Sequence, residues 1–235
     1  YSVAHHPNAG SKYVLGGTQD NGSWKVDGTT LSNGTFLTGG DGGFAHIDQQ
    51  DPNYQFLGSN YNTIYRSTNG GNSWSLYSDY TVNGADTGTL INPTGIDDGT
   101  KTLYANVDGS TILRLTNYEQ LATTSTMSIN LGSQSTFFVA SPYTDDVMYV
   151  GTQAGRVFKI VKASTASFSA EDISGSNISG YISSIDIGAS DEQILVTVSN
   201  YGAESVFETY SGGGSNGWRN VEGDLPDIPV RGALY

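Results

Sequence analysis

The sequence predicts an all-β fold built from repeated antiparallel units, and three observations carry this prediction. The 235 residues include 31 Gly and 15 Tyr, whereas charged residues make up only 14% of the chain. Glycine is typical of turns and tyrosine of strands, while the scarcity of Lys, Glu and Arg disfavours long helices. The third observation is an internal repeat. With 36% hydrophobic residues, the chain has enough apolar side chains for a single domain over residues 1–235.

The repeat consists of five segments, each with an apolar run, a polar turn, a second apolar run and a turn rich in Gly or Asn. The second runs carry Tyr13, Tyr54, Tyr104, Tyr149 and Leu195, which are 41, 50, 45 and 46 residues apart. A period in the forties with about four short strands per unit is typical of β-propeller blades. The alternative is a β-sandwich in which this spacing is a coincidence.

Each unit divides into four expected strands in the same order. The two apolar runs supply the first and second strands, runs such as "RVFKIV" the third and runs such as "SWSLYS" the fourth. Alternation of apolar and polar residues favours strands over helices. The expected blades are 1–36, 37–84, 85–131, 132–175 and 176–223, followed by one strand of a sixth blade at 228–235. Because an open edge invites association, we expect this to be part of a larger propeller, with the rest of a longer polypeptide or an assembly beside it.

Composition and charge exclude several kinds of partner. The 23 acidic and 10 basic side chains give a net charge of −13, which repels nucleic-acid backbones and anionic lipids. No run approaches the roughly 20 apolar residues of a membrane span, so we expect neither a nucleic-acid partner nor membrane insertion. Adjacent strand residues point to opposite faces, so His5 and His6 cannot share a metal ion, and His46 lies on another strand. We therefore expect no metal site, and no cofactor is indicated.

The turn "STNGGNSW", residues 67–74, has a recognisable pattern. It resembles the Asp-box, the Ser-x-Asp-x-Gly-x-Thr-Trp hairpin of sialidase-like (BNR repeat) propellers, with Asn and Ser in place of Asp and Thr. In such a turn an Asx side chain accepts backbone N–H bonds, glycine permits positive φ, and tryptophan packs between blades. The resemblance implies a structural role for five residues, Ser67, Asn69, Gly71, Ser73 and Trp74.

Longer strings resemble one branch of this superfamily. The strings "GGTQDNGSW", "GGDGGFAHIDQQDPNYQF" and "VEGDLPDIPVRGALY" are similar to propellers of large secreted proteins of Bacteroidota, commonly exported by the type IX secretion route. Sortilin-type and family 74 glycoside hydrolase propellers share the repeat. The resemblance implies a protein that is secreted or exposed at the cell surface. It specifies function much less than fold, because propellers host unrelated activities.

One face of the expected propeller gathers the candidate ligand contacts. In a propeller, the connection between the second and third strands of a blade and the connection into the next blade lie on the same face, around the central channel. This arrangement brings Asp20 and Asp41 near each other. The other candidates on this face are Asn60, Tyr61, Asn62, Asp108, Asn200, Tyr201, Asp227 and Arg231.

Two functions are compatible with this face. The leading expectation is a non-catalytic recognition or scaffold module that binds a glycan or a protein. The alternative is a glycoside hydrolase, because "GGDGGFAH" resembles the segment around one catalytic Asp of family 74 xyloglucanases and endoglucanases. That resemblance implies a catalytic role for Asp41, and Asp20, which is expected near it on the same face, is the candidate for the second carboxylate. We favour the interpretation that both are turn carboxylates that bond backbone N–H groups. A sialidase needs three arginines that together bind the substrate carboxylate. Three of the five arginines here fall in third strands, away from the channel, so sialidase activity is disfavoured.

Overall fold

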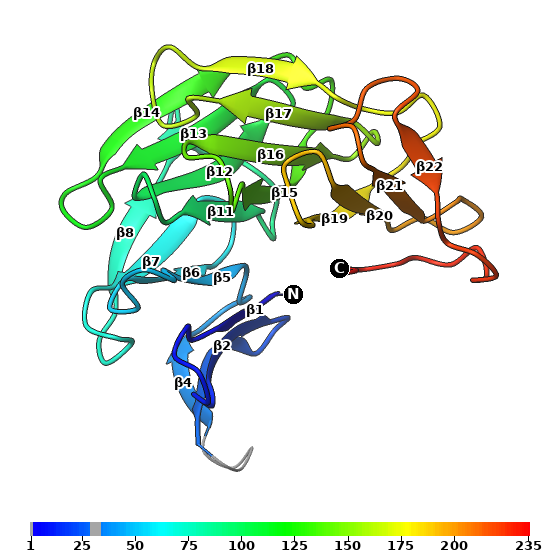
Figure 1. Ribbon diagram of the computed structural model, residues 1–235. Helices are drawn as coiled ribbons and strands as arrows, with labels where there is room; N and C mark the ends of the chain where they lie inside the picture. The colour runs from blue at the N-terminus through cyan, green and yellow to red at the C-terminus, as the bar shows by residue number, and fades with distance from the viewer. Residues whose placement is uncertain (1, 29–33) are drawn as a thin grey trace.

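The computed structural model describes residues 2–28 and 34–235 and confirms the all-β propeller architecture (Figure 1). The described residues form five four-stranded antiparallel sheets, the blades, in which strands that follow each other in sequence pair with each other. They contain no helix, and so no helix that could cross a membrane. Short polar turns join the strands, as the glycine content predicted.

The first three blades span the N-terminal half of the chain. Blade 1 is β1 (Ser2–His5), β2 (Tyr13–Thr18), β3 (Gly22–Asp27) and β4 (Gly34–Thr38), and blade 2 is β5 (Ala45–Ile47), β6 (Gln55–Gly58), β7 (Thr63–Ser67) and β8 (Ser75–Asp79). Blade 3 is β11 (Thr94–Asp97), β12 (Thr102–Asp108), β13 (Thr111–Thr116) and β14 (Thr123–Ser128).

The last two blades follow without a break. Blade 4 is β15 (Ser135–Ala140), β16 (Val147–Thr152), β17 (Val157–Val161) and β18 (Ser169–Asp172), and blade 5 is β19 (Ile182–Ile187), β20 (Ile194–Val198), β21 (Val206–Thr209) and β22 (Trp218–Asn220). The first strand of each blade lies innermost and the fourth lies at the rim (Figure 1).

A small additional hairpin lies between blades 2 and 3. It consists of β9 (Thr81–Val82) and β10 (Ala85–Asp86), joined by Asn83 and Gly84, which both have positive φ (52° and 77°). Two consecutive residues of this conformation make the tight turn that suits a two-residue hairpin loop. The insertion explains why the interval between Tyr54 and Tyr104 is the longest in the repeat.

Two tyrosines of the repeat, Tyr13 and Tyr149, bond to the neighbouring blade through their hydroxyls. The Tyr13 hydroxyl donates to Gln55 Oε1 at 2.6 Å, across the boundary between blades 1 and 2. The Tyr149 hydroxyl donates to the carbonyl oxygen of Asp191 at 3.3 Å, from blade 4 to blade 5. A buried aromatic ring with a hydrogen-bonded hydroxyl fills an interblade space without leaving a polar group unpaired.

The hydrophobic core is a series of four interblade layers. Leu15 and Leu57 occupy the first layer, Phe56 and Leu113 the second, and all four are at most 1% exposed. The remaining layers lie between blades 3 and 4, around Met148 and Val150, and between blades 4 and 5, around Val196 and Phe207. Since each strand alternates its side chains between the two faces, a blade buries one face against each neighbour.

The turn at residues 67–74 joins β7 to β8 and is closed by its own side chains. Asn69 Oδ1 accepts from the Ser73 amide at 3.0 Å, and Ser67 Oγ accepts from the Gly71 amide at 2.9 Å. Trp74 packs against the layer between blades 1 and 2. The turn "YSGGGSNGW" after β21, residues 210–218, is a weaker copy of this pattern that keeps the Trp, and Thr209 Oγ1 accepts from the Gly213 amide at 3.2 Å, four residues on, as Ser67 does from Gly71. The contacts suit a turn-forming role for these residues.

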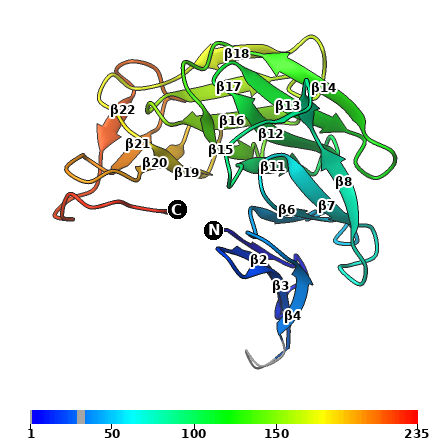
Figure 2. The ribbon, with the colours of Figure 1, turned by 180° about the vertical axis from the view of Figure 1, so that it is seen from behind.

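The five blades form an arc with both chain ends at its inner side (Figures 1 and 2). Within the described residues, no strand of blade 1 pairs with a strand of blade 5. The face of blade 1 that points away from blade 2 carries Val3, Trp24 and Phe36, which are 64%, 37% and 54% exposed. In blades 2 to 5 the corresponding face is covered by the preceding blade.

The strand expected at 228–235 is not formed as a paired strand. The segment instead lies against blade 5, where Ser183 Oγ donates to the carbonyl oxygen of Val230 at 2.6 Å and the Tyr235 amide donates to Asp186 Oδ2 at 2.9 Å. Adjacent blades pack face to face, so this segment meets mainly side chains of blade 5, and the Val230 amide makes one backbone bond, to the Val198 carbonyl at 3.2 Å. The sequence predicted a strand at 228–235, whereas the structure shows a segment that packs on blade 5 without forming a strand.

Candidate functional site

Asp41 holds two connections of the predicted ligand face together. It lies between β4 and β5, where its carboxylate accepts from the Asp20 amide at 2.8 Å and from Asn60 Nδ2 at 3.2 Å. Asp20 sits in the β2–β3 turn with a φ of 58°, and Asn60 sits in the β6–β7 turn. The structure therefore brings three predicted residues into direct contact. The Asp41 carboxylate stabilises the neighbouring β2–β3 turn by accepting a hydrogen bond from its backbone.

Tyr61 and Asn62 follow Asn60 but have different environments. Tyr61 has a φ of 56°, and its side chain is 36% exposed. Asn62 is 1% exposed, and its Nδ2 donates to Thr87 Oγ1 at 2.8 Å and to the carbonyl oxygen of Asn106 at 2.9 Å. The prediction that Asn62 contacts a ligand is therefore wrong, because its side chain is buried and used within the protein.

Asn62 belongs to a buried amide network that sequence reasoning missed. Asn92 Nδ2 donates to Asn62 Oδ1 and to the Asn106 carbonyl, both at 2.8 Å, and Asn106 Nδ2 donates to Gln134 Oε1 at 2.7 Å. Asn106 Oδ1 also accepts from the Ser135 amide at 3.0 Å. These bonds connect blades 2, 3 and 4 beneath the ligand face. The clustering of Asn residues near strand ends was the available signal, but their pairing depends on long-range register.

The remaining predicted residues lie in two places: Asp108 lies at the end of β12 in blade 3, and a second group consists of Asn200, Tyr201 and Asp227. Asp108 accepts from the Ser110 amide at 2.7 Å, and this bond, against the opposing effect of burial, holds the pKa of Asp108 below its usual range. Asn200 Oδ1 accepts from the Tyr181 amide at 2.7 Å, and Tyr201 is 82% exposed. The Gly202 amide donates to the carbonyl oxygen of Asp227 at 3.0 Å. The second group therefore surrounds the start of blade 5.

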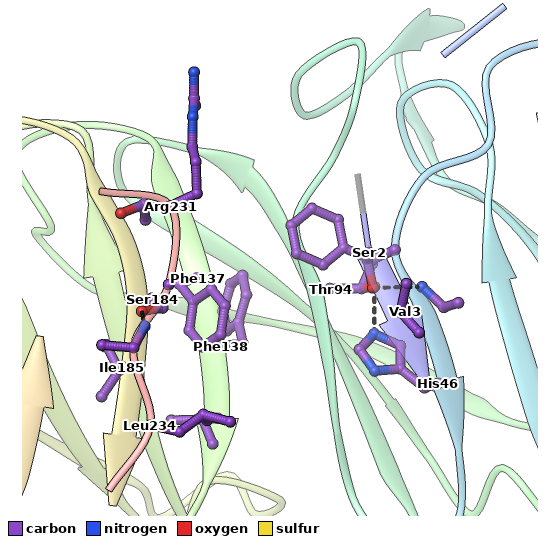
Figure 3. Close-up of a pocket in the computed structure, with 16 residues that line it drawn as sticks. Ser2, Val3, His46, Thr94, Phe137, Phe138, Ser184, Ile185, Arg231 and Leu234 are labelled. Carbon is purple, nitrogen blue, oxygen red and sulfur yellow. Dashed lines mark hydrogen bonds between the residues drawn. The ribbon is translucent and has the colours of Figure 1, made fainter. Parts of the chain in front are cut away.

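The inner strands of all five blades enclose a channel cavity of about 820 Å³ (Figure 3). One wall carries Ser2, Val3, His46 and Thr94, and the facing wall carries Phe137, Phe138, Ser184, Ile185 and Leu234. The first wall is mainly polar and the facing wall is mainly apolar. Among the described residues that line the cavity, none is Asp or Glu.

His46 is the titratable group of the first wall. Its Nε2 lies 2.8 Å from Thr94 Oγ1, which links blades 2 and 3 inside the channel. Burial lowers the pKa of His46 to about 4, against a smaller opposing effect of the hydrogen bond. The imidazole is therefore neutral near pH 7. Within residues 2–28 and 34–235, no three His, Asp or Glu side chains gather in a way that could hold a metal ion.

A second cavity of about 460 Å³ adjoins the channel on the ligand face and is called the mouth pocket here. Its lining residues are Phe44, Ile91, Thr136, Tyr181, Ser183 and Arg231. Tyr181 is 39% exposed, and Thr136 Oγ1 is buried without a hydrogen-bond partner in the described structure. An aromatic ring, hydroxyls and a guanidinium around one cavity can bind a polar, ring-shaped ligand. Of these six residues, the sequence predicted only Arg231.

Comparisons with known proteins address the fold. No protein-family model matches the chain, and no curated protein matches it. The crystal structure of an ancestral GH74 enzyme matches 96% of this chain at 16% identity, with a TM-score of 0.67. The GH74 enzyme of Niastella koreensis matches 95% at 18% identity, with a TM-score of 0.61. This likeness agrees with the predicted resemblance to family 74 propellers in fold, and the chain spans 31% of the length of each enzyme.

Proposed function

We propose that this chain is a non-catalytic recognition module that binds a polysaccharide at the mouth pocket. The observation that carries the proposal is the combination of a half-exposed aromatic ring, Tyr181, with the hydroxyls of Thr136 and Ser183 in one cavity. Sugar rings present apolar C–H faces that pack on aromatic rings and hydroxyls that exchange hydrogen bonds. The exposed rings of Tyr61 and Tyr201 extend the aromatic surface on the same face of the propeller.

The bonding of Asp41 argues against catalysis by this chain alone. A glycoside hydrolase needs two carboxylates that flank a sugar linkage, with about 5 to 9.5 Å between them. Asp41 is bonded to the Asp20 amide and to Asn60, and no described residue that lines the channel cavity or the mouth pocket is acidic. Both observations favour a binding role.

A glycoside hydrolase is the second candidate function. The "GGDGGFAH" segment around Asp41 and the fold shared with two GH74 enzymes support it. In this case Asp41 is one of the reacting carboxylates and Asp20 is the nearest second one. The chain spans about a third of the length of each enzyme. Hydrolytic activity like that of a whole enzyme is therefore proposed here only as this second candidate.

The binding proposal is tested by calorimetric titration of soluble β-glucans and xyloglucan into the wild type, Tyr181→Ala and Tyr210→Ala. Tyr210 is 56% exposed and lies after β21, at the opposite side of the blade. We expect Tyr181→Ala to weaken binding roughly twofold to tenfold, since a ring contact of this kind contributes about 0.5–1.5 kcal/mol. Tyr210→Ala is expected to bind like the wild type. Equal losses in both variants would refute the assignment to the mouth pocket.

Hydrolysis of the same glucans separates the two candidates. If the wild type releases reducing sugar and Asp41→Asn does not, the enzyme is the correct description. If the wild type and Asp41→Asn both show no hydrolysis while the wild type binds glucan, the recognition module is correct.

The wider setting is part of the same proposal. A module that binds polysaccharide meets its ligand outside the cell, so we propose a secreted or cell-surface location, as the resemblance to secreted Bacteroidota propellers implies. We also propose that the exposed face of blade 1, with Val3, Trp24 and Phe36, is covered by a further part of a longer polypeptide or assembly. Detection of the native protein with an antibody, in the culture medium or on intact cells, tests the location.

A further inference from the structure

Arg231 differs from the other four arginines in its surroundings. Each of the others is paired: Arg66 with the Gln120 carbonyl, Arg114 with the Ala163 carbonyl, Arg156 with Asp172 and Arg219 with Glu208. The guanidinium of Arg231 has no hydrogen bond and no ion pair with any described residue. It lines both the channel cavity and the mouth pocket. An unpaired guanidinium beside a cavity is available to an incoming anion.

The backbone that carries Arg231 is fixed on both sides. The Val230 amide donates to the Val198 carbonyl at 3.2 Å, and the Val230 carbonyl accepts from Ser183 Oγ at 2.6 Å. On the other side, the Ala233 amide donates to Ser184 Oγ at 3.4 Å. In Figure 3 the Arg231 side chain extends away from the apolar wall formed by Phe137, Phe138 and Leu234. The backbone is therefore held beside the mouth pocket, and the exposed side chain of Arg231 is accessible to a ligand there.

The electrostatic setting makes this place distinctive. The protein has 23 acidic side chains and a net charge of −13, yet no Asp or Glu is among the described residues that line either cavity. A ligand group at this position meets a cation without a competing carboxylate. Guanidinium binds planar carboxylate groups with two parallel hydrogen bonds, which gives both strength and orientation.

Thr136 supplies an independent observation in the same pocket. Its side chain is 3% exposed, and Oγ1 has no partner in the described structure although it is buried. Buried hydroxyls without a partner are uncommon and are often completed by a ligand or a water molecule. Thr136 and Arg231 thus offer one neutral and one charged hydrogen-bonding group around the ring of Tyr181.

We infer that the glycan bound at the mouth pocket carries a carboxylate on its ring, as in a polysaccharide that contains uronic acid. The carboxylate pairs with Arg231, a ring hydroxyl pairs with Thr136 Oγ1, and the apolar side of the ring packs on Tyr181. This inference rests on the proposed function and adds the class of sugar that the pocket selects.

The test is calorimetric titration of the protein with an oligogalacturonate, an oligoglucuronate and a neutral cello-oligosaccharide of equal length. We expect at least one of the acidic ligands to bind more tightly than the neutral one, and its binding to weaken as salt is raised. Arg231→Met is expected to lower affinity for that ligand about tenfold to hundredfold, the effect of losing a charged hydrogen-bonded pair, and to lower affinity for the neutral oligosaccharide far less. Lys12→Met removes an equal charge at an exposed residue of blade 1 and is the matched control.

The outcomes separate this inference from the proposed function. If neutral and acidic ligands bind equally, the uronate inference is overturned and the recognition module stands. If Arg231→Met and Lys12→Met weaken binding equally, the effect is one of net charge and the inference is again overturned. Tighter binding of a sulfated oligosaccharide than of both uronates overturns the carboxylate assignment. No binding of any of these ligands overturns the inference and the proposed function together.

Discussion

The Asp41 carboxylate accepts a hydrogen bond of 2.8 Å from the backbone amide of Asp20, and this bond joins a turn of blade 1 to the connection that enters blade 2. A carboxylate in this position has a structural task, whether or not it also meets a substrate. Because Asp20 adopts positive φ, its amide points toward Asp41 in a turn that few other residues would form without strain. The relative positions of the turns on the ligand face therefore depend on the single side chain of Asp41.

Replacing Asp41 separates this structural task from chemistry. Asp41→Ala removes the acceptor of two hydrogen bonds, so we expect the free energy of unfolding to fall by about 1–2 kcal/mol. Asp41→Asn keeps an oxygen that can accept from Asp20 and is expected to lose less than half of that amount. Urea denaturation followed by circular dichroism measures both. Equal losses in the two variants would show that the charge itself, rather than the accepted bond, holds the turns together.

Gly71 is required by a close approach between blades. Its φ is 75°, and an added Cβ would collide with the Tyr13 hydroxyl and lie 2.7 Å from Gln55 Oε1. Gly84 has a φ of 77° but nothing within 4 Å of the same position. We expect Gly84→Ala to cost about 1 kcal/mol, the penalty of positive φ alone, and Gly71→Ala to cost at least twice as much. Thermal unfolding of both variants checks this, and similar costs would mean that Tyr13 moves aside freely.

The amide network predicts an unusually large effect for a neutral polar residue. Asn92→Ala removes two donors from a buried site and leaves Asn62 Oδ1 with one partner fewer. Unpaired buried groups cost about 1–3 kcal/mol each, so we expect a loss of roughly 2–4 kcal/mol. Asn21→Ala, at an exposed turn residue, is the control and is expected to cost less than about 1 kcal/mol. Comparable losses in chemical denaturation would contradict a cooperative network.

The sequence predicted the blades well because each blade is formed by four strands that follow each other in the chain. The repeated tyrosines, such as Tyr13 and Tyr149, occupy equivalent strands, and period-two alternation follows from strand geometry alone. The mouth pocket was largely missed because Thr136, Tyr181 and Arg231 come from different parts of the chain and meet only across the channel. Asn62 was placed on the ligand face for its loop position, but burial depends on which residues lie above that loop.

His46 predicts a loss of stability in mild acid. Burial lowers its pKa to about 4 in the folded protein, whereas an unfolded chain has a His pKa of about 6.5. The unfolded state therefore binds the proton more tightly, and stability falls as pH decreases from about 6.5 to about 4. His46→Gln removes this contribution, so the difference in unfolding free energy between wild type and variant changes across that window. His5→Gln, at an exposed position of β1, is the matched control substitution.

Asp98 makes the opposite contribution in an overlapping range of pH. Burial raises its pKa to about 6, although the Gln49 amide, which donates to its carboxylate at 2.9 Å, acts against this. The unfolded value is about 3.9, so the folded state binds the proton more tightly and this contribution to stability declines as pH rises from about 4 to about 6.

Asp98→Asn tests this, because the amide can still accept from Gln49 but does not ionise. Relative to the wild type, we expect the variant to gain stability steadily between about pH 4 and pH 6 and to keep that gain at pH 7. Asp86→Asn changes the same charge at an exposed residue of β10 and is the control. Thermal unfolding at half-unit pH intervals gives both difference curves. A flat curve for Asp98→Asn would mean that water reaches this carboxylate in the folded protein and keeps its pKa near the ordinary value.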